Sequence, residues 1–346
     1  MKVGIENVIS ELTEQEKHYF PAGLEGELKV VRKIWRPYSR VYRIQAGANG
    51  STRYFWVKMF KMPEGFKEKA DKYLSRLKTE FDITQKLQAA FVDTAEMGVI
   101  SPLAFFPQFG AVVTWESKGQ PLSDLIDRYA RLWSKDANDS LLLDYAHKCG
   151  QALARMQQFT LHDTEYDPFE LIEYADIRLQ RLVKNKRAPF SEAQRKQVLT
   201  FLEREIPHVS IEERRVCGVH SDFAAFNVLA ADGHITLTDF TSFKTGSSYV
   251  DLTYFYQRLG GFLHKPIFRE NFIRQLQQEF LSGYGISGIE HHRMFTLSLV
   301  RHTINNFSSL ARNRRGGLGK IPLPHVQLFH RRIFHIYREW LDQVCV

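Results

Sequence analysis

The first 116 residues carry a hydrophobic pattern that predicts strands, then a helix, then strands again. Three segments dominated by β-branched and aromatic residues are typical of strands: 28–35, 40–45 and 53–60. A turn is expected between the last two, at the glycine-rich segment 47–50. Across 66–90 the apolar residues instead recur at helical spacing, at Leu74, Leu77, Phe81 and Leu87. Two further apolar segments predict two more strands, roughly 99–105 and 109–116.

From about residue 121 the pattern becomes mainly helical. One apolar stripe with the spacing of a helix face consists of Tyr145, Cys149, Ala152, Leu153 and Met156. Only the segment 216–239 interrupts this part with the composition of short strands. We therefore expect an α+β fold with a β-rich lobe at 1–116, a mainly helical lobe at 117–346, and a cleft between them.

Composition narrows the class of protein. Of the 346 residues 44% are hydrophobic, which is enough for a large core and argues against global disorder. The chain begins without a basic leader and apolar run, and its three cysteines lack metal-ligand spacing, so we expect a cytoplasmic protein with reduced thiols. The net charge is +8, and residues 291–346 hold nine Arg or Lys against two Asp or Glu.

The segment 216–239 contains a pattern suited to phosphoryl transfer. The Asp232-Gly233 pair predicts a tight turn between strands at 228–230 and 235–238. Pairing of these strands brings Asn227 and Asp239 together at their outer ends, where an amide oxygen and a carboxylate can hold Mg²⁺ on nucleotide phosphates. Asp222 lies on the loop that enters the hairpin, where its carboxylate can orient an acceptor hydroxyl and accept its proton.

These residues also carry a family resemblance. The pattern His220-x-Asp222-x-x-x-x-Asn227, followed by Asp239-Phe240 and then Asp251-Leu252, resembles the aminoglycoside phosphotransferase and choline kinase branch of the protein-kinase-like superfamily. The resemblance implies a two-lobed kinase-like fold that uses ATP and Mg²⁺. It implies Asp222 as the catalytic base and Asn227 and Asp239 as metal ligands. His220 and Asp251 would then hold the catalytic loop in place.

The amino-terminal lobe supplies candidates for nucleotide binding. Lys58 is the cation at the centre of an apolar strand, with Val57 and Met59 facing the opposite side, and it is the candidate to bind phosphates. Glu80 falls on the inward stripe of the helix at 66–90 and is the candidate partner of Lys58. The segment 111–116, including Thr114 and Glu116, is expected to lead into the hinge, where the backbone would meet adenine.

Three positions depart from the pattern of the family. The loop between the first two strands, 36–40, has no glycine to cover the phosphates, although Ser39 or Arg40 could contribute. Thr241 follows Asp239-Phe240 where relatives often have glycine. Ala224 stands where relatives often have a charged or cyclic polar residue. A catalytically weak nucleotide-binding pseudokinase is therefore one alternative.

The acceptor is expected to be the hydroxyl of a small molecule. The basic carboxyl-terminal half favours an anionic acceptor, such as a phosphorylated sugar or a sugar–lipid precursor, over a polycationic aminoglycoside. A second alternative is a protein that binds anionic surfaces peripherally through the basic segment 312–320. No specific nucleic-acid partner is expected, and the oligomeric state stays open.

Overall fold

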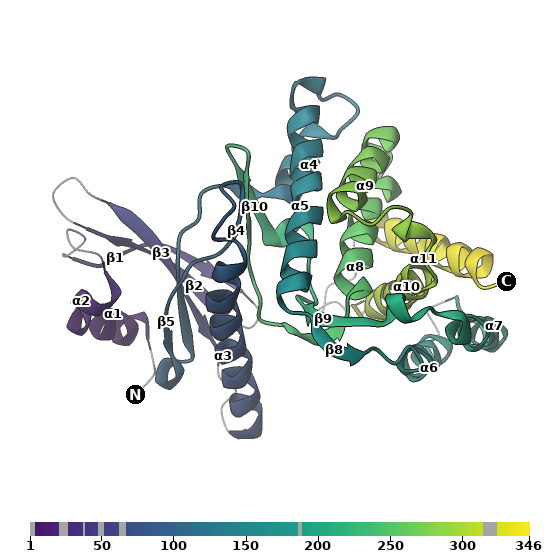
Figure 1. Cartoon of the computed structure of the whole chain (residues 1–346), viewed down its shortest axis with the longest axis horizontal. Helices are drawn as coiled ribbons and strands as arrows, with labels where there is room; N and C mark the ends of the chain where they lie inside the picture. The colour runs from purple at the N-terminus through teal and green to yellow at the C-terminus, as the bar shows by residue number, and fades with distance from the viewer. Residues whose placement is uncertain are drawn as a thin grey trace.

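The computed structural model describes residues 4–20, 27–36, 39–47, 52–61, 67–185, 189–313 and 324–346. Two lobes lie side by side along the long axis, with the β-rich lobe at the amino-terminal end and most of the helices in the other (Figure 1). The predicted α+β, two-lobed fold is therefore confirmed. The lobe boundary at residue 116 stays a prediction.

An antiparallel five-stranded sheet forms the amino-terminal lobe, in the order β1-β2-β3-β6-β5. Its strands are β1 (Lys29–Trp35), β2 (Ser39–Ala46), β3 (Arg53–Phe60), β5 (Pro102–Phe106) and β6 (Ala111–Trp115). Alternation along β3 buries Val57 and Met59 in the core of this lobe and turns Lys58 to the opposite face. That face is met by α3 (Lys67–Ala90), which agrees with the helix predicted at 66–90.

Two helices that the sequence analysis did not predict cover the other face of this sheet (Figure 1). They are α1 (Ile5–Glu14) and α2 (Glu16–Tyr19). Ile5, Val8 and Leu12 are buried against the sheet, and their spacing is that of one helix face. The pattern that predicts α1 is thus present in the sequence. Residues 48–50 of the predicted turn lie outside the described part of the chain.

A second sheet joins the two lobes, in the order β4-β11-β10-β7. The strand predicted at 99–105 divides into β4 (Met97–Val99) and β5 of the first sheet. Pro102 has no backbone N–H for a continuous ladder, and β4 pairs instead in parallel with β11 (His234–Leu237). The remaining strands are β7 (Gln120–Pro121) and β10 (Val228–Ala231), which pair with each other.

The carboxyl-terminal lobe is built on helices around one large apolar core. Its helices are α4 (Leu122–Tyr129), α5 (Asp139–Phe159), α6 (Glu170–Val183), α7 (Glu192–Glu205), α8 (Tyr249–Gly260), α9 (Glu270–Tyr284), α10 (Arg293–Asn313) and α11 (Pro324–Val344). A small sheet in the order β12-β9-β8 lies beside them. Its strands are β8 (His162–Glu165), β9 (Arg215–Val219) and β12 (Lys244–Ser247). The described helices contain no stretch long and apolar enough to cross a bilayer.

Candidate active site

A buried carboxylate accepts hydrogen bonds from the loop that follows β9. Asp251, near the start of α8, accepts hydrogen bonds from the backbone N–H groups of His220 at 2.6 Å and Ser221 at 2.9 Å. Burial raises the pKa of Asp251 to about 6, against the opposing effects of His220 and these N–H groups. Ser221 has a φ of 67°, a left-handed conformation that is uncommon for a residue with a side chain. The two hydrogen bonds that Asp251 accepts help to hold this strained turn, and the predicted anchoring role fits this geometry.

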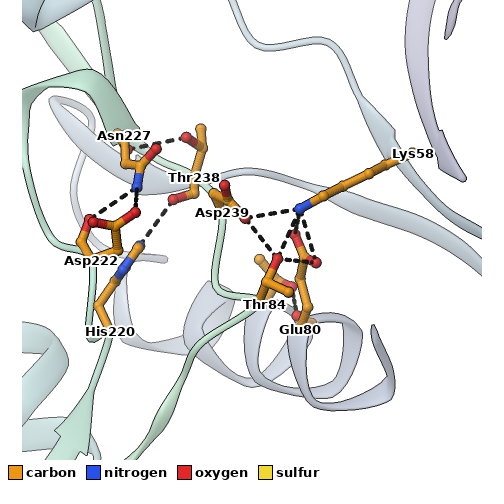
Figure 2. Close-up of polar contacts among 9 residues, drawn as sticks. Lys58, Glu80, Thr84, His220, Asp222, Asn227, Thr238 and Asp239 are labelled. Carbon is orange, nitrogen blue, oxygen red and sulfur yellow. Dashed lines mark hydrogen bonds and ion pairs between the residues drawn. The ribbon is translucent and has the colours of Figure 1, made fainter. Parts of the chain in front are cut away.

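The His220 ring links this loop to the strand that precedes Asp239 (Figure 2). Its Nε2 lies 2.9 Å from the carbonyl oxygen of Thr238, so Nε2 carries the proton and donates it. The same ring packs on Phe240, with 4.5 Å between the ring centroids. His220 is fully buried, so it suits a structural role better than a proton-transfer role.

The hairpin β10–β11 forms as the Asp232-Gly233 pair predicts, with Val228 opposite Leu237. Beyond the ladder, the backbone N–H of Thr238 donates to the carbonyl of Asn227 at 3.0 Å. This pairing brings Asn227 next to the residue before Asp239. At the other end of the hairpin, Lys148 of α5 donates to the carbonyl of Gly233 at 2.7 Å. Helix α5 therefore fixes the hairpin on which the predicted metal ligands lie.

Asp222 receives hydrogen bonds from two side chains. Asn227 Nδ2 lies 2.9 Å from the Asp222 carbonyl and 3.3 Å from its Oδ2, and the hydroxyl of Tyr254 donates to Oδ1 at 3.0 Å. Burial raises the pKa of Asp222, while the hydrogen bond from Tyr254 opposes the rise. A carboxylate with a raised pKa is better suited to accept a proton near neutral pH. Tyr254, on α8, was not among the predicted site residues.

Lys58 connects the two lobes (Figure 2). Its Nζ lies 3.2 and 3.3 Å from the carboxylate oxygens of Glu80 and 2.8 Å from Oδ1 of Asp239. Burial disfavours the charge on Lys58, but Glu80 and Asp239 outweigh it and raise the pKa of the amine. Burial likewise opposes the charge of Asp239, yet Lys58 brings the pKa of this carboxyl below its usual value. Both groups are therefore charged at neutral pH.

Thr241 adds a hydroxyl to this group. Its Oγ1 lies 2.8 Å from Nζ of Lys58, 2.7 Å from Oε2 of Glu80 and 2.7 Å from Oδ1 of Asp239. The sequence analysis treated Thr241 only as a departure from the family pattern. A polar residue two positions after a candidate metal ligand is the signal that could have identified it.

The segment 111–116, which is predicted to contact adenine, already makes contacts with neighbouring strands of the amino-terminal lobe. Thr114 lies in β6 opposite Trp56, two residues from Lys58 along β3. The carboxylate of Glu116 forms an ion pair with Arg43 at 2.6 Å, and the backbone N–H of Glu116 donates to the carbonyl of Tyr54 at 2.9 Å. A contact between Glu116 and a nucleotide would therefore use its carbonyl oxygen. The nucleotide-binding roles of Thr114 and Glu116 stay predictions.

The glycine-free loop at 36–40 is described only in part, because residues 37 and 38 lie outside the described part. Ser39 begins β2, and its carbonyl accepts a hydrogen bond from the N–H of Arg36 at 2.9 Å. The guanidinium of Arg40 lies 4.9 Å from the centroid of the Trp35 ring. The contributions of Ser39 and Arg40 to phosphate binding stay predictions.

The donor set fits magnesium. Nδ2 of Asn227 points to Asp222, which leaves the amide oxygen of Asn227 as a possible ligand. Oδ1 of Asp239 contacts Lys58 and Thr241, whereas Oδ2 makes no hydrogen bond within the described residues. Mg²⁺ usually takes one or two protein oxygens and completes its shell with phosphates and water. The described residues hold no cluster of three or more His, Cys, Asp or Glu that could bind a metal.

Comparisons with known proteins give a family match over the part of the chain that contains these residues. The model of the phosphotransferase enzyme family matches residues 118–289, which include the catalytic loop, the hairpin and Asp251. A comparison with curated protein sequences gives no match. The family resemblance inferred from the motifs at 220–252 is confirmed by the match, and so is the prediction of a phosphotransferase.

Solved structures share the fold over almost the whole chain. An aminoglycoside phosphotransferase from Alicyclobacillus acidocaldarius has a TM-score of 0.54 at 13% identity, covering 94% of each chain. A choline kinase from Cryptosporidium parvum has a TM-score of 0.55 at 12% identity, covering 99% of this chain and 98% of that one. An amicoumacin kinase in complex with AMP-PNP and Ca²⁺ has a TM-score of 0.53 at 14% identity, covering 97% and 95%. At these identities the likeness establishes the fold.

Proposed function

We propose that the protein is an ATP- and Mg²⁺-dependent kinase that transfers the γ-phosphate to a hydroxyl group of an anionic small molecule. The proposal rests on one observation: the amine of Lys58 on β3 contacts the carboxylates of Glu80 on α3 and of Asp239 in the loop after β11. An amine held between two carboxylates from different lobes is placed to bind nucleotide phosphates between the lobes. The amicoumacin kinase that shares the fold contains a nucleotide analogue and a divalent cation, which supports the choice of cofactors.

Asp222 is the proposed catalytic base. It accepts the proton of the acceptor hydroxyl as the hydroxyl oxygen attacks the γ-phosphorus, and the bond from this phosphorus to the β–γ bridging oxygen breaks to release ADP. Lys58 holds the phosphates, and Glu80 keeps the Lys58 amine in position. Asn227 and Asp239 would hold Mg²⁺. When bound, the ion neutralises charge on the phosphates.

Two properties of the chain support the remaining parts of the proposal. Its three cysteines are free and buried, which suits the reducing cytoplasm, where ATP is available. The positive charge of the carboxyl-terminal half supports an anionic acceptor. The alternative of an anionic-surface protein relies on the segment 312–320, whose side chains lie outside the described part. A kinase is therefore the function that the described residues support best.

Release of ADP tests this function directly. Purified protein is given MgATP with neutral, anionic and cationic hydroxyl compounds, and ADP is measured for wild type, Asp222→Asn and Asp82→Asn. We expect acceptor-dependent ADP release that Asp222→Asn lowers by about 10²-fold or more, since a positioned base contributes about 10²–10⁴-fold. Asp82 faces Lys78 on the exposed side of α3, so Asp82→Asn should behave as wild type. Nucleotide binding without turnover on any acceptor would favour the pseudokinase alternative.

A further inference from the structure

An arginine lies beside the catalytic loop without a carboxylate partner among the described residues. Arg258 is exposed near the end of α8, four residues after Tyr254. Its guanidinium makes no hydrogen bond or ion pair with any residue that the structure describes. The mechanism proposed above does not use it. An exposed cation whose N–H donors have no such partner is available to bind an anionic group of a ligand.

Two aromatic rings border this guanidinium. Its central carbon lies 5.6 Å from the centroid of the Phe226 ring and 5.9 Å from that of the Tyr254 ring. Contacts of this kind favour a guanidinium near the ring and leave its N–H groups available for hydrogen bonds. Phe226 is itself 38% exposed. Arg258 and Phe226 thus place a cation and an exposed apolar ring next to each other.

Both rings belong to residues that lead directly to Asp222. The hydroxyl of Tyr254 donates to Oδ1 of Asp222 at 3.0 Å, so Tyr254 has the proposed base at its hydroxyl and Arg258 near its ring. Phe226 immediately precedes Asn227, whose Nδ2 lies 3.3 Å from Oδ2 of Asp222. An acceptor that brings a hydroxyl to Asp222 therefore has its remaining groups in the neighbourhood of Arg258 and Phe226.

The charge of Arg258 acts on two tyrosines that lie on different helices. Burial and Asp222 raise the pKa of Tyr254, and Arg258 opposes this rise. Burial also raises the pKa of Tyr337 on α11, and Arg258 again opposes it. The carboxylate of Asp222 forms no ion pair with Arg258, so one ligand can place a hydroxyl at Asp222 and an anionic group at Arg258. A cationic group at the same place would be repelled.

We propose that Arg258 binds an anionic group, a carboxylate or a phosphate, of the acceptor whose hydroxyl lies at Asp222. This inference rests on the proposed function, and it makes Arg258 a specificity-determining residue. The planar guanidinium donates two parallel hydrogen bonds to either kind of anion. The preference for an anionic acceptor then comes from one side chain beside the proposed base, in addition to the overall charge of the carboxyl-terminal half.

Binding of matched sugars tests the inference. The protein is saturated with Mg²⁺ and AMP-PNP, so that the nucleotide phosphate site is filled, and titrated with glucose, glucose 6-phosphate, glucuronate and glucosamine. We expect at least one of the two anionic sugars to bind about tenfold or more tightly than glucose. Arg258→Gln should abolish this preference, and Arg258→Glu should reverse it in favour of glucosamine. Arg274→Gln, which removes an exposed arginine of α9, should keep it.

The preferred anionic sugar shows whether the group is a carboxylate or a phosphate. Wild type that binds AMP-PNP but prefers neither anionic sugar would overturn the inference and leave the kinase proposal standing, as would an equal preference in wild type and Arg258→Gln. Weaker AMP-PNP binding by Arg258→Gln, with the order of the sugars unchanged, would assign Arg258 to the nucleotide and also overturn it. Wild type that does not bind AMP-PNP would contradict the kinase proposal itself, and this inference with it.

Discussion

Tyr254 and Thr241 each place a hydroxyl group against a carboxylate of the candidate active site. Burial and the nearby charge of Asp222 raise the pKa of Tyr254 to about 12, so the phenol stays protonated and donates to Asp222 at neutral pH. Donation to a carboxylate favours its charged form, which is the form that accepts a proton. Tyr254 is therefore expected to tune the proposed base without contacting the phosphate.

Removing this donor should change the pH dependence of the reaction. In Tyr254→Phe the ionised form of Asp222 loses a hydrogen bond, so the pKa of Asp222 rises further and the base is protonated at a higher pH. The acid limb of the pH profile of kcat/KM for ADP release should then move to higher pH. Tyr256→Phe, two residues along α8, is the control, because no described residue shares a hydrogen bond with the hydroxyl of Tyr256. An unmoved acid limb would show that Tyr254 has no such effect.

Residues that follow a regular period or belong to the motif at 220–252 could be predicted from the sequence, whereas Thr241 and Tyr254 could not. Strand alternation identified Lys58, and the helical stripe identified Glu80; their contact distances agree with both predictions. Thr241 and Tyr254 reach the site because a left-handed residue, Asp239 with a φ of 65°, and the Asp251 anchor orient the backbone around them. No local sequence pattern encodes those distances.

At the scale of elements, α5 supports the active-site hairpin and crosses α9 at very close range. Gly150 of α5 and Gly283 of α9 lie at this crossing, and a Cβ on Gly283 would overlap the backbone carbonyl of His147. A Cβ on Gly150 would overlap the carbonyl of Phe280 in the same way. Only residues without a side chain permit this approach, so the position of α5, and with it Lys148 under the hairpin, depends on the two glycines.

Alanine at position 283 should therefore destabilise the protein. Gly283→Ala forces the backbones of α5 and α9 apart, and overpacking of this kind costs about 1–3 kcal/mol in the free energy of unfolding. Gly261→Ala is the matched control, since no described atom lies within 4 Å of its added Cβ, and it should stay within about 0.5 kcal/mol of wild type. Urea unfolding of both variants measures the difference. Equal stability would contradict the close crossing.

Helix α1 was missed although its pattern is present, whereas the strands that the sequence analysis missed are short and have distant partners. β4 is three residues long and pairs with β11, which lies more than 130 residues further along the chain. The edge strands β8 and β12 are four residues each and gain their place only from β9 between them. Hydrophobic periodicity needs longer segments to distinguish a strand from a loop.

At the scale of the whole molecule, the site depends on how the two lobes meet. Lys58 and Asp239 lie 181 residues apart in sequence and 2.8 Å apart in space. In the sheet β4-β11-β10-β7, the outer strands β4 and β7 belong to the segments that lead out of the amino-terminal lobe, and the inner strands β11 and β10 form the active-site hairpin. The hydroxyl oxygens of Ser117 and Thr236 lie 2.8 Å apart, and Thr236 is part of β11. The motifs at 220–252 predicted the two-lobed arrangement, but no motif in the sequence indicates the class of acceptor.

Nucleotide binding across this junction is the central claim, and thermal stability with and without MgATP tests it most directly. A ligand at about 100 times its Kd adds about 2.7 kcal/mol to the free energy of unfolding. We predict a magnesium-dependent rise in Tm for wild type and for Asp82→Ala, and no such rise for Asp239→Ala, which loses a proposed metal ligand. Folded wild-type protein that shows no rise at millimolar MgATP, or an equal rise in Asp239→Ala, would contradict the account.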